Sequence, residues 1–178
     1  MVIPHGIYDL KLNKGMINIG TSSDTAEFAC DCIRKWWYQH GIKDYHQATS
    51  ILILCDGGGS NNCNQYLFKA DLQALCNEIG IEVRIAHYPA YCSKYNPIEH
   101  RLFPHVTRAC RGVIFSSVEV VKDLISRTRT KTGLSVAVDV IDKVYETGRK
   151  VCQTFKKNMP IIFDDDLPKW NYRAVPQT

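Results

Sequence analysis

The chain has 178 residues, of which 45% are hydrophobic and 22% are charged, so its composition is that of a globular protein rather than of a disordered or fibrous one. It contains no apolar run of 18 residues and no signal peptide, and we therefore expect a cytoplasmic protein without a membrane partner. The formal net charge of +4 is mildly basic and is compatible with a nucleic-acid partner.

The eight cysteines argue against a zinc site or a disulfide framework, because they include no Cys-x-x-Cys pair. Several of them fall at apolar positions of predicted strands and helices, where a thiol behaves as a small hydrophobic side chain. We therefore expect reduced, mostly buried thiols in a reducing compartment. The eight are Cys30, Cys32, Cys55, Cys63, Cys76, Cys92, Cys110 and Cys152.

The first predicted elements are a β-hairpin and a helix. The hairpin covers residues 5–20, in which apolar residues flank an Asn-Lys-Gly turn signal at residues 13–15. Asp24 begins the helix as its N-cap, and Glu27 completes a capping box with it. Apolar residues then recur at helical spacing as far as Gly41, which we expect to end the helix.

The middle of the chain alternates strands and helices. Residues 51–55 form a continuous apolar run, which is typical of a strand buried on both faces. A helix is predicted over residues 66–79, ending at Gly80, and residues 81–86 alternate as a strand does. Asn96 caps a further helix, which we expect to continue to about residue 111.

The last part of the chain has weaker patterns. We expect a helix over residues 117–129 and a strand over residues 134–141, followed by a turn or short helix. Residues 1–155 are assigned to one domain, in keeping with the length of the chain. Residues 156–178 are assigned to a C-terminal tail of irregular chain that packs on this domain.

Two acidic residues stand where an α/β protein gathers metal ligands. Asp56 ends the apolar run of residues 51–55, and Glu99 falls 43 positions later on the first turn of the helix that Asn96 caps. Ligands of open α/β sheets bind beyond the carboxyl ends of the strands, and Mg²⁺ takes oxygen ligands. The pair therefore indicates a site for metal-assisted phosphoryl transfer.

Each acid also has a structural explanation. Asp56 fits a turn aspartate whose carboxylate accepts hydrogen bonds from the amides of the following glycines. Glu99 fits the third position of a capping box that begins at Asn96. The run Gly57–Ser60 leaves open an unrelated α/β enzyme that binds phosphate there, although no Gly-Lys-Ser/Thr sequence follows it.

A family resemblance runs along almost the whole chain. Seven segments resemble, in order, those of the catalytic domain of ISAzo-type insertion-sequence transposases, which are DDE enzymes with a ribonuclease-H-like fold. The segments are Ile3–Asp9 (IPHGIYD), Asp24–Ala29 (DTAEFA), Ile33–Trp37 (IRKWW), Asp56–Asn61 (DGGGSN), Ser93–Phe103 (SKYNPIEHRLF), Thr130–Leu134 (TKTGL) and Trp170–Tyr172 (WNY).

The resemblance implies an α/β fold with a mixed sheet flanked by helices. It also implies a DNA transposase, an enzyme that cleaves and joins DNA strands during insertion-sequence transposition. Asp56 and Glu99 match two of the three catalytic acids, which in intact relatives hold two Mg²⁺ ions beside the transposon ends. The third acid of such enzymes lies on the first, central strand, upstream of the segment that matches Ile3–Asp9.

No strand fits before Ile3, so we expect an N-terminally truncated transposase domain that lacks the first central strand and the first catalytic Asp. Asp24 is assigned to helix capping, and the resemblance gives no metal role to Asp9 or Asp31. We therefore expect the chain alone to be inactive, with open hydrogen-bonding edges on the hairpin and on the strand that ends at Asp56. The alternative is a non-catalytic module that binds DNA or pairs with a full-length transposase.

Polar and basic residues complete the predicted site. Asn61 and His100 lie beside the two acids in sequence. One interpretation is that Asn61 contacts water or phosphate around the metal and that His100 faces the DNA strand, and the alternative for each is a solvent-exposed or capping role. Basic residues near Glu99 are expected to hold DNA phosphates, with an ordinary solvent-exposed helix face as the alternative. These basic residues are Lys94, Arg101, Arg108 and Arg111.

Overall fold

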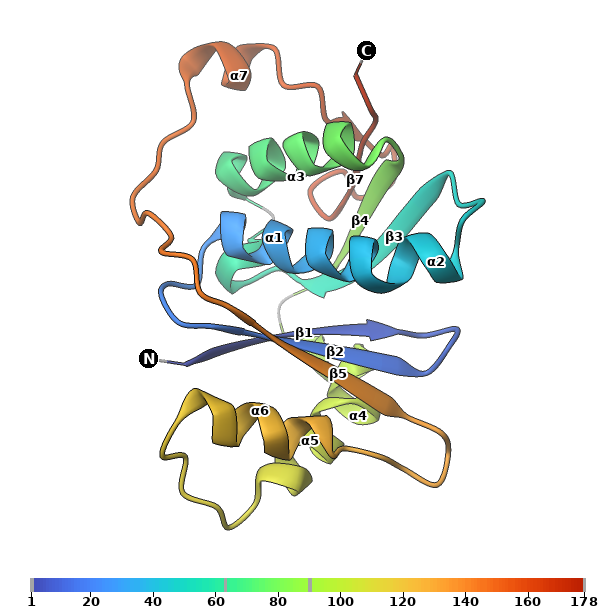
Figure 1. Cartoon of the computed structure of the whole chain (residues 1–178). Coiled ribbons are helices and arrows are strands. Elements are labelled where there is room, and N and C mark those ends of the chain that lie inside the picture. The colour runs from blue at the N-terminus through green and yellow to red at the C-terminus, as the bar shows by residue number, and fades with distance from the viewer. Residues whose placement is uncertain (1, 63, 90, 178) are drawn as a thin grey trace. The chain divides into compact units, whose positions relative to one another are not determined.

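The computed structural model describes residues 2–62, 64–89 and 91–177 as an α/β protein (Figure 1). The chain divides into two compact units, each of which combines an early and a late segment. Unit 1 comprises residues 1–23 and 94–145, and unit 2 comprises residues 24–93 and 146–178. The predicted boundary between a domain and a tail at residue 155 stays a prediction. No helix within the described residues has the length and apolar character needed to cross a membrane.

The sheet of unit 1 begins with the predicted hairpin. β1 (Ile3–Asp9) pairs antiparallel with β2 (Lys14–Gly20), and β5 (Ser135–Ile141) lies parallel to β2 on its other side. At the turn, the Asp9 carboxylate accepts hydrogen bonds from the backbone N–H groups of Lys11 and Leu12 over 2.9 and 3.0 Å. The hairpin and the late strand are therefore confirmed, with β2 in the middle of the sheet.

Three helices of unit 1 share an apolar core with this sheet: α4 (Ile98–Arg101), α5 (Phe103–Cys110) and α6 (Val118–Ser126). Figure 1 shows α5 and α6 on one face of the three strands. Gly15 of β2 allows the close approach of Leu102, because a Cβ atom at this glycine would lie 2.5 Å from Leu102 Cδ1. The core residues are Ile17, Ile19, Leu102, Val121, Ile125, Leu134 and Val136.

The single helix predicted from Asn96 to about residue 111 is wrong. Two helices form instead, α4 and α5, with a break at Leu102, whose backbone has φ −121° and ψ −63°. Pro104 explains the break, because proline has no amide hydrogen to donate to the carbonyl four residues earlier and its ring clashes with that carbonyl. The break coincides with the complete burial of Leu102 in the core of unit 1.

Unit 2 contains a second sheet, with strand order β3-β4-β7-β6. β3 (Ser50–Asp56) and β4 (Glu82–Tyr88) are the two strands predicted in this region, and they pair in parallel. β7 (Asn171–Ala174) pairs antiparallel with β4, and β6 (Ile162–Phe163) pairs antiparallel with β7. The expectation of irregular chain after residue 155 is therefore wrong for these two strands. They are too short to show an alternating pattern. β7 is stabilised by pairing with the distant β4, and β6 by pairing with β7.

The first helix of unit 2, α1 (Ala26–Trp36), packs against α3 (Tyr66–Ile79). Its N-cap is Thr25, whose Oγ1 accepts a hydrogen bond from the N–H of Phe28 over 3.2 Å. The predicted cap at Asp24 is therefore wrong by one residue. Either residue type can cap a helix, and the local backbone decides between neighbours.

The ends of the two helices differ. After α1 the chain continues through one π turn, η1 (Trp37–Gly41), into α2 (Ile42–Asp44), so the predicted end at Gly41 is wrong. This glycine accommodates the Trp37 ring, since a Cβ atom there would lie 2.5 Å from Trp37 Cε3. α3 does end at Gly80, which has the left-handed φ of 73° that glycine adopts readily.

An ion-pair cluster attaches the segment after β5 to unit 2. The Arg149 guanidinium donates to Asp71 Oδ1 and to Glu27 Oε2, each over 2.9 Å. It thereby joins this segment to both α1 and α3. The remaining short elements are η2 (Gly59–Asn61), η3 (Ser93–Tyr95) and α7 (Gln153–Lys157).

The cysteines agree with the predicted thiols wherever the structure describes them. The seven described cysteines form no disulfide, and Cys30, Cys32, Cys55 and Cys76 are buried. Burial raises the pKa of Cys30 and of Cys32, so both stay protonated at neutral pH. Cys63 lies outside the described residues.

Two edge strands keep unpaired sides in the described part of the chain. β1 pairs with β2 alone, and β3 pairs with β4 alone. These are the two strands for which open edges were predicted, and in the described part of the chain each has one unpaired side. The prediction that residues 51–55 are buried on both faces is wrong, because Leu52 is 63% exposed on a strand that is paired on one side only.

Candidate functional site

Asp56 is the last residue of β3, where it lies opposite Tyr88 at the end of β4. Its side chain is exposed, and the carboxylate makes no hydrogen bond or ion pair with any described residue. The alternative role as an acceptor for the glycine amides is therefore not observed. The chain turns away from Asp56 through Gly59, whose φ of 58° favours glycine, to the buried Ser60.

Glu99 lies on the first turn of α4 and is exposed. Asn96, which is 8% exposed, accepts a hydrogen bond at Oδ1 from the N–H of Ile98 over 3.4 Å. The Glu99 carboxylate does not complete the capping box, since it bonds to no residue in the described ranges. Of the two hydrogen bonds of the predicted capping box, the structure therefore has the one to Asn96 and lacks the one to Glu99. The Glu99 carboxylate is available to bind a ligand.

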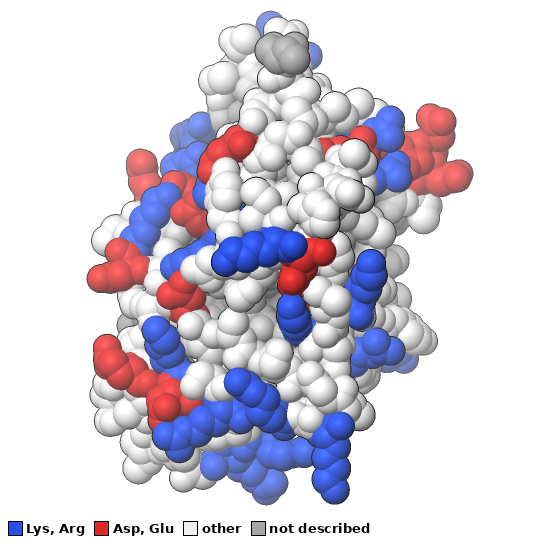
Figure 2. All heavy atoms as spheres, turned by 45° about the vertical axis from the view of Figure 1, so that its right-hand side comes forward, with Lys and Arg blue, Asp and Glu red and all other residues white. Residues whose placement is uncertain are grey.

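The predicted DNA-binding residues all belong to unit 1 and are all exposed. In the described part of the chain, the side chains of Arg101, Arg108 and Arg111 make no ion pair or hydrogen bond. The ammonium of Lys94 lies 5.1 Å from the centre of the Tyr95 ring. Figure 2 shows Lys and Arg side chains gathered at the lower edge of the molecule, where the α5 and α6 helices of Figure 1 lie. Their contact with DNA stays a prediction.

His87 holds the backbone at the end of β3. Its Nδ1 lies 2.9 Å from the carbonyl oxygen of Asp56, and its Nε2 lies 2.8 Å from the Tyr172 hydroxyl. A carbonyl only accepts, so Nδ1 carries the proton and Nε2 accepts from Tyr172. Burial lowers the pKa of His87, and the charge of Lys69 lowers it further. The Asp56 backbone is therefore held by a neutral imidazole.

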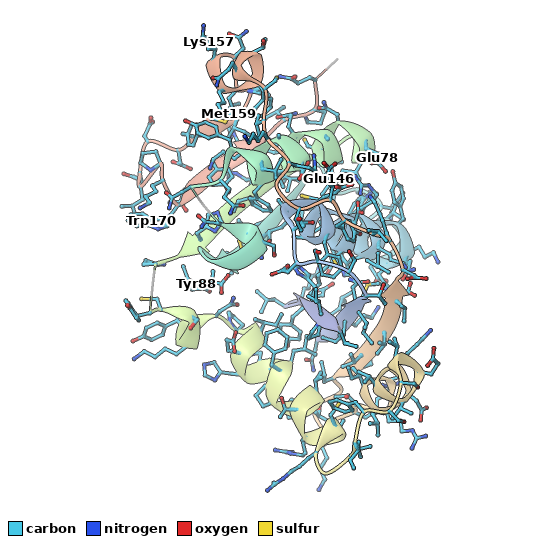
Figure 3. The ribbon with its side chains drawn as sticks, turned by 90° about the vertical axis from the view of Figure 1, so that its left-hand side faces the viewer. Glu78, Tyr88, Glu146, Lys157, Met159 and Trp170 are labelled. Atoms are coloured by element: carbon cyan, nitrogen blue, oxygen red, sulfur yellow. The ribbon has the colours of Figure 1, made fainter. Side chains whose placement is uncertain are left out.

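Trp170 and Tyr172 bring the end of the chain to this site. The backbone N–H of His87 donates to the carbonyl of Trp170 over 2.9 Å. Figure 3 labels Trp170, just before β7, and Tyr88, at the end of β4. Sequence reasoning did not connect Tyr172 with the site. The matching segment Trp170–Tyr172 was the available signal, but it does not show which strand β7 pairs with.

Asn61 and His100, the other two predicted site residues, lie near the acids in sequence. Asn61 ends η2, five residues after Asp56, and is partly exposed. His100 is exposed, and its Nε2 is hydrogen-bonded to the carbonyl of Lys94, so the ring fixes the chain before α4. Asp56 lies in unit 2 and Glu99 in unit 1, and their convergence stays a prediction. Among the described residues, no group of three or more His, Cys, Asp and Glu side chains is arranged to hold a metal ion.

Comparison with protein-family models shows to which family the chain belongs. A family model described as the Rhodopirellula transposase DDE domain matches residues 1–176. The chain belongs to this family. Comparisons with curated proteins and with solved structures found no match. Membership identifies the two mixed sheets and their helices as a DDE transposase domain of the ribonuclease-H-like class. Enzymes of this family act on DNA and generally use divalent metal ions.

Proposed function

We propose that Asp56 and Glu99 ligate divalent metal in a transposase active site that cleaves and joins DNA strands. The observation that carries this proposal is that both carboxylates are exposed and neither bonds to a described residue. Each also stands at the end of an element, Asp56 after β3 and Glu99 on the first turn of α4. Carboxylate oxygens suit Mg²⁺, so the donor set fits the metal.

The chain's own residues would hold and orient the reacting groups. Two bound Mg²⁺ ions would stabilise the attacking and leaving oxygens of an in-line displacement at a DNA phosphate. Asp56 is held through its backbone by His87, and Glu99 by the first turn of α4. Asn61 and His100 are proposed to contact water or phosphate beside the ions. Phosphates of the DNA are proposed to lie against the basic residues Lys94, Arg101, Arg108 and Arg111.

We further propose that the chain is catalytically incomplete by itself. The open edges of β1 and β3 support this, because each offers backbone pairing to a further strand. Such a strand is where DDE enzymes carry their first Asp. With two of three ligands, a two-metal clamp is incomplete, and the chain is expected neither to cleave nor to join DNA.

The same open edges favour a second candidate function. An exposed edge strand can accept a strand from another chain by backbone pairing, so the chain would act as a non-catalytic module that pairs with a full-length transposase. The family match disfavours the third idea, an unrelated phosphate-binding enzyme. The Gly57–Ser60 loop also does not lead directly into an α-helix, since it ends in the short 3-10 turn η2 and α3 begins at Tyr66.

The test is the affinity of the 178-residue chain for Mn²⁺, measured by electron paramagnetic resonance. Asp56→Asn and Glu99→Gln are each expected to weaken binding by about tenfold or more, while Asp165→Asn, a carboxylate of the β6–β7 segment, is the matched control. Unchanged affinity in both site variants would contradict the proposed ligands. Mg²⁺- or Mn²⁺-dependent nicking of plasmid DNA that disappears in Asp56→Ala would contradict the proposed incompleteness.

A further inference from the structure

The loop between α5 and α6 carries three consecutive apolar residues in solvent. Val113, Ile114 and Phe115 are 42%, 89% and 56% exposed. Single exposed apolar residues are common on proteins, but a contiguous apolar patch marks an interaction surface. None of the three takes part in the apolar core of unit 1. We call residues 113–115 the apolar loop.

Both ends of the apolar loop are fixed. Gly112, with a φ of 77°, turns the chain out of α5. Ser117 caps α6, its Oγ accepting a hydrogen bond from the N–H of Val120 over 3.3 Å. On either side, Cys110 of α5 and Val118 of α6 pack against the core. The apolar side chains are therefore presented from a rigid base.

The charges around the loop specify an anionic partner. Arg108 and Arg111, in the last turn of α5 and at its end, are exposed and make no ion pair among the described residues. Residues 94–131 contain eight Lys and Arg against three Asp and Glu, whereas the rest of the chain contains fourteen against fifteen. The positive excess of the protein thus lies in the segment that carries the apolar loop.

One acid, Glu119, lies near the loop in sequence. Hydrogen bonds to its own backbone N–H and to Ser117 lower the pKa of Glu119. Its charge is therefore directed at the N-terminus of α6, where negative charge is stabilising. The two arginines that precede the loop have no such local partner among the described residues.

We propose that the apolar loop is a wedge that enters a groove of duplex DNA while Arg108 and Arg111 contact the flanking phosphates. The inference rests on the proposed function, since it takes DNA as the partner, and adds a contact separate from the metal ligands. Apolar side chains of groove-binding proteins insert between base steps and partly unstack them. Phosphate contacts of Lys and Arg supply affinity that falls with salt. An anionic membrane surface also attracts basic and apolar residues, so the test includes it.

The experiment measures binding of the full chain to a fluorescent 25-base-pair duplex as a function of salt. A second duplex carries 2-aminopurine at a central TA step, so that unstacking raises its fluorescence. The wedge variant is Ile114→Ser with Phe115→Ser, and the phosphate variant is Arg108→Gln with Arg111→Gln. The control is Val144→Ser, an apolar residue of unit 1 that is 88% exposed and lies outside the loop.

The wedge variant is expected to bind about tenfold more weakly, with an unchanged salt slope and no rise in 2-aminopurine fluorescence. The phosphate variant is expected to lose about one unit of slope for each contact removed. Wild-type affinity in the wedge variant, or an equal loss in Val144→Ser, would overturn the wedge while leaving the metal-site proposal intact. Binding to vesicles of equal phosphatidylcholine and phosphatidylglycerol is measured in parallel. A wedge variant that loses vesicle binding but keeps its affinity for DNA would also overturn the wedge. No binding of DNA by any of the proteins would overturn both proposals.

Discussion

His87 and Tyr172, 85 positions apart in the chain, share a hydrogen bond of 2.8 Å between the imidazole Nε2 and the phenol hydroxyl. Tyr172→Phe removes the donor and leaves a buried acceptor without its bond, which costs about 1–3 kcal/mol. We therefore expect the free energy of unfolding in urea to fall by that amount. Tyr88→Phe, at the partly exposed end of β4, is the control and should leave stability nearly unchanged. Equal stability of the two variants would show that the bond does not contribute.

The buried His87 also predicts how stability depends on pH. Its pKa lies below the ordinary value of 6.5 in the folded chain because of burial. The unfolded chain therefore binds the proton more tightly, so this contribution to stability is fully present above pH 6.5 and decreases as the pH falls below it. Unfolding in urea at pH 8 and at pH 5.5 measures the difference. His87→Gln should reduce this dependence, whereas the exposed His46→Gln should retain it.

Arg149 is expected to matter for the stability of unit 2. Asp71, its partner, has a side chain that is 12% exposed, and burial raises its pKa, so the guanidinium offsets the cost of a nearly buried charge. Arg149→Gln should lower the free energy of unfolding by about 1–3 kcal/mol. Its neighbour Lys150, which is exposed, provides the control variant Lys150→Gln. Adding Asp71→Asn to the Arg149 variant should recover part of the loss. If the double variant were no more stable than Arg149→Gln, the two residues would contribute to stability independently.

Local patterns were sufficient to predict some elements but not their partners. The apolar run before Asp56 and the glycine after α3 act within a few residues, and the predicted strand and the predicted helix end are both confirmed. Burial of this strand on both faces is not, because Leu52 is exposed. Pro104 was a local signal for the break at Leu102 that the helix prediction overlooked. β7 could not be predicted, because it is short and its pairing with β4 joins segments more than 80 positions apart.

At the candidate site, too, local positions could be predicted from the sequence, whereas side-chain contacts could not. The strand-end position of Asp56 and the first-turn position of Glu99 followed from residue patterns and from the resemblance to transposases. Whether each carboxylate was occupied by a local hydrogen bond depended on side-chain geometry, which the sequence leaves open. The support that His87 gives to the Asp56 backbone also needed the structure, because it requires the register of β3 against β4.

The open edges of β1 and β3 predict a marginal or aggregation-prone protein when the chain is made alone. Fusion to a segment that supplies a pairing strand should raise the melting temperature and reduce aggregation, because backbone pairing and apolar burial are restored together. Thermal unfolding with and without the added segment measures this. A cooperative, monomeric transition of the bare chain at about 60 °C or above, the upper range of ordinary mesophilic domains, would show that the edges are satisfied in another way.

The proposed function requires that Asp56 and Glu99 serve one metal site. A crystal structure of the chain grown with Mn²⁺, with anomalous diffraction recorded to locate the metal, tests it most directly. We predict an anomalous peak with carboxylate oxygens of both residues at metal-ligand distances of about 2.0–2.6 Å. Carboxyl groups more than about 10 Å apart, too far to share one or two ions, would contradict the account.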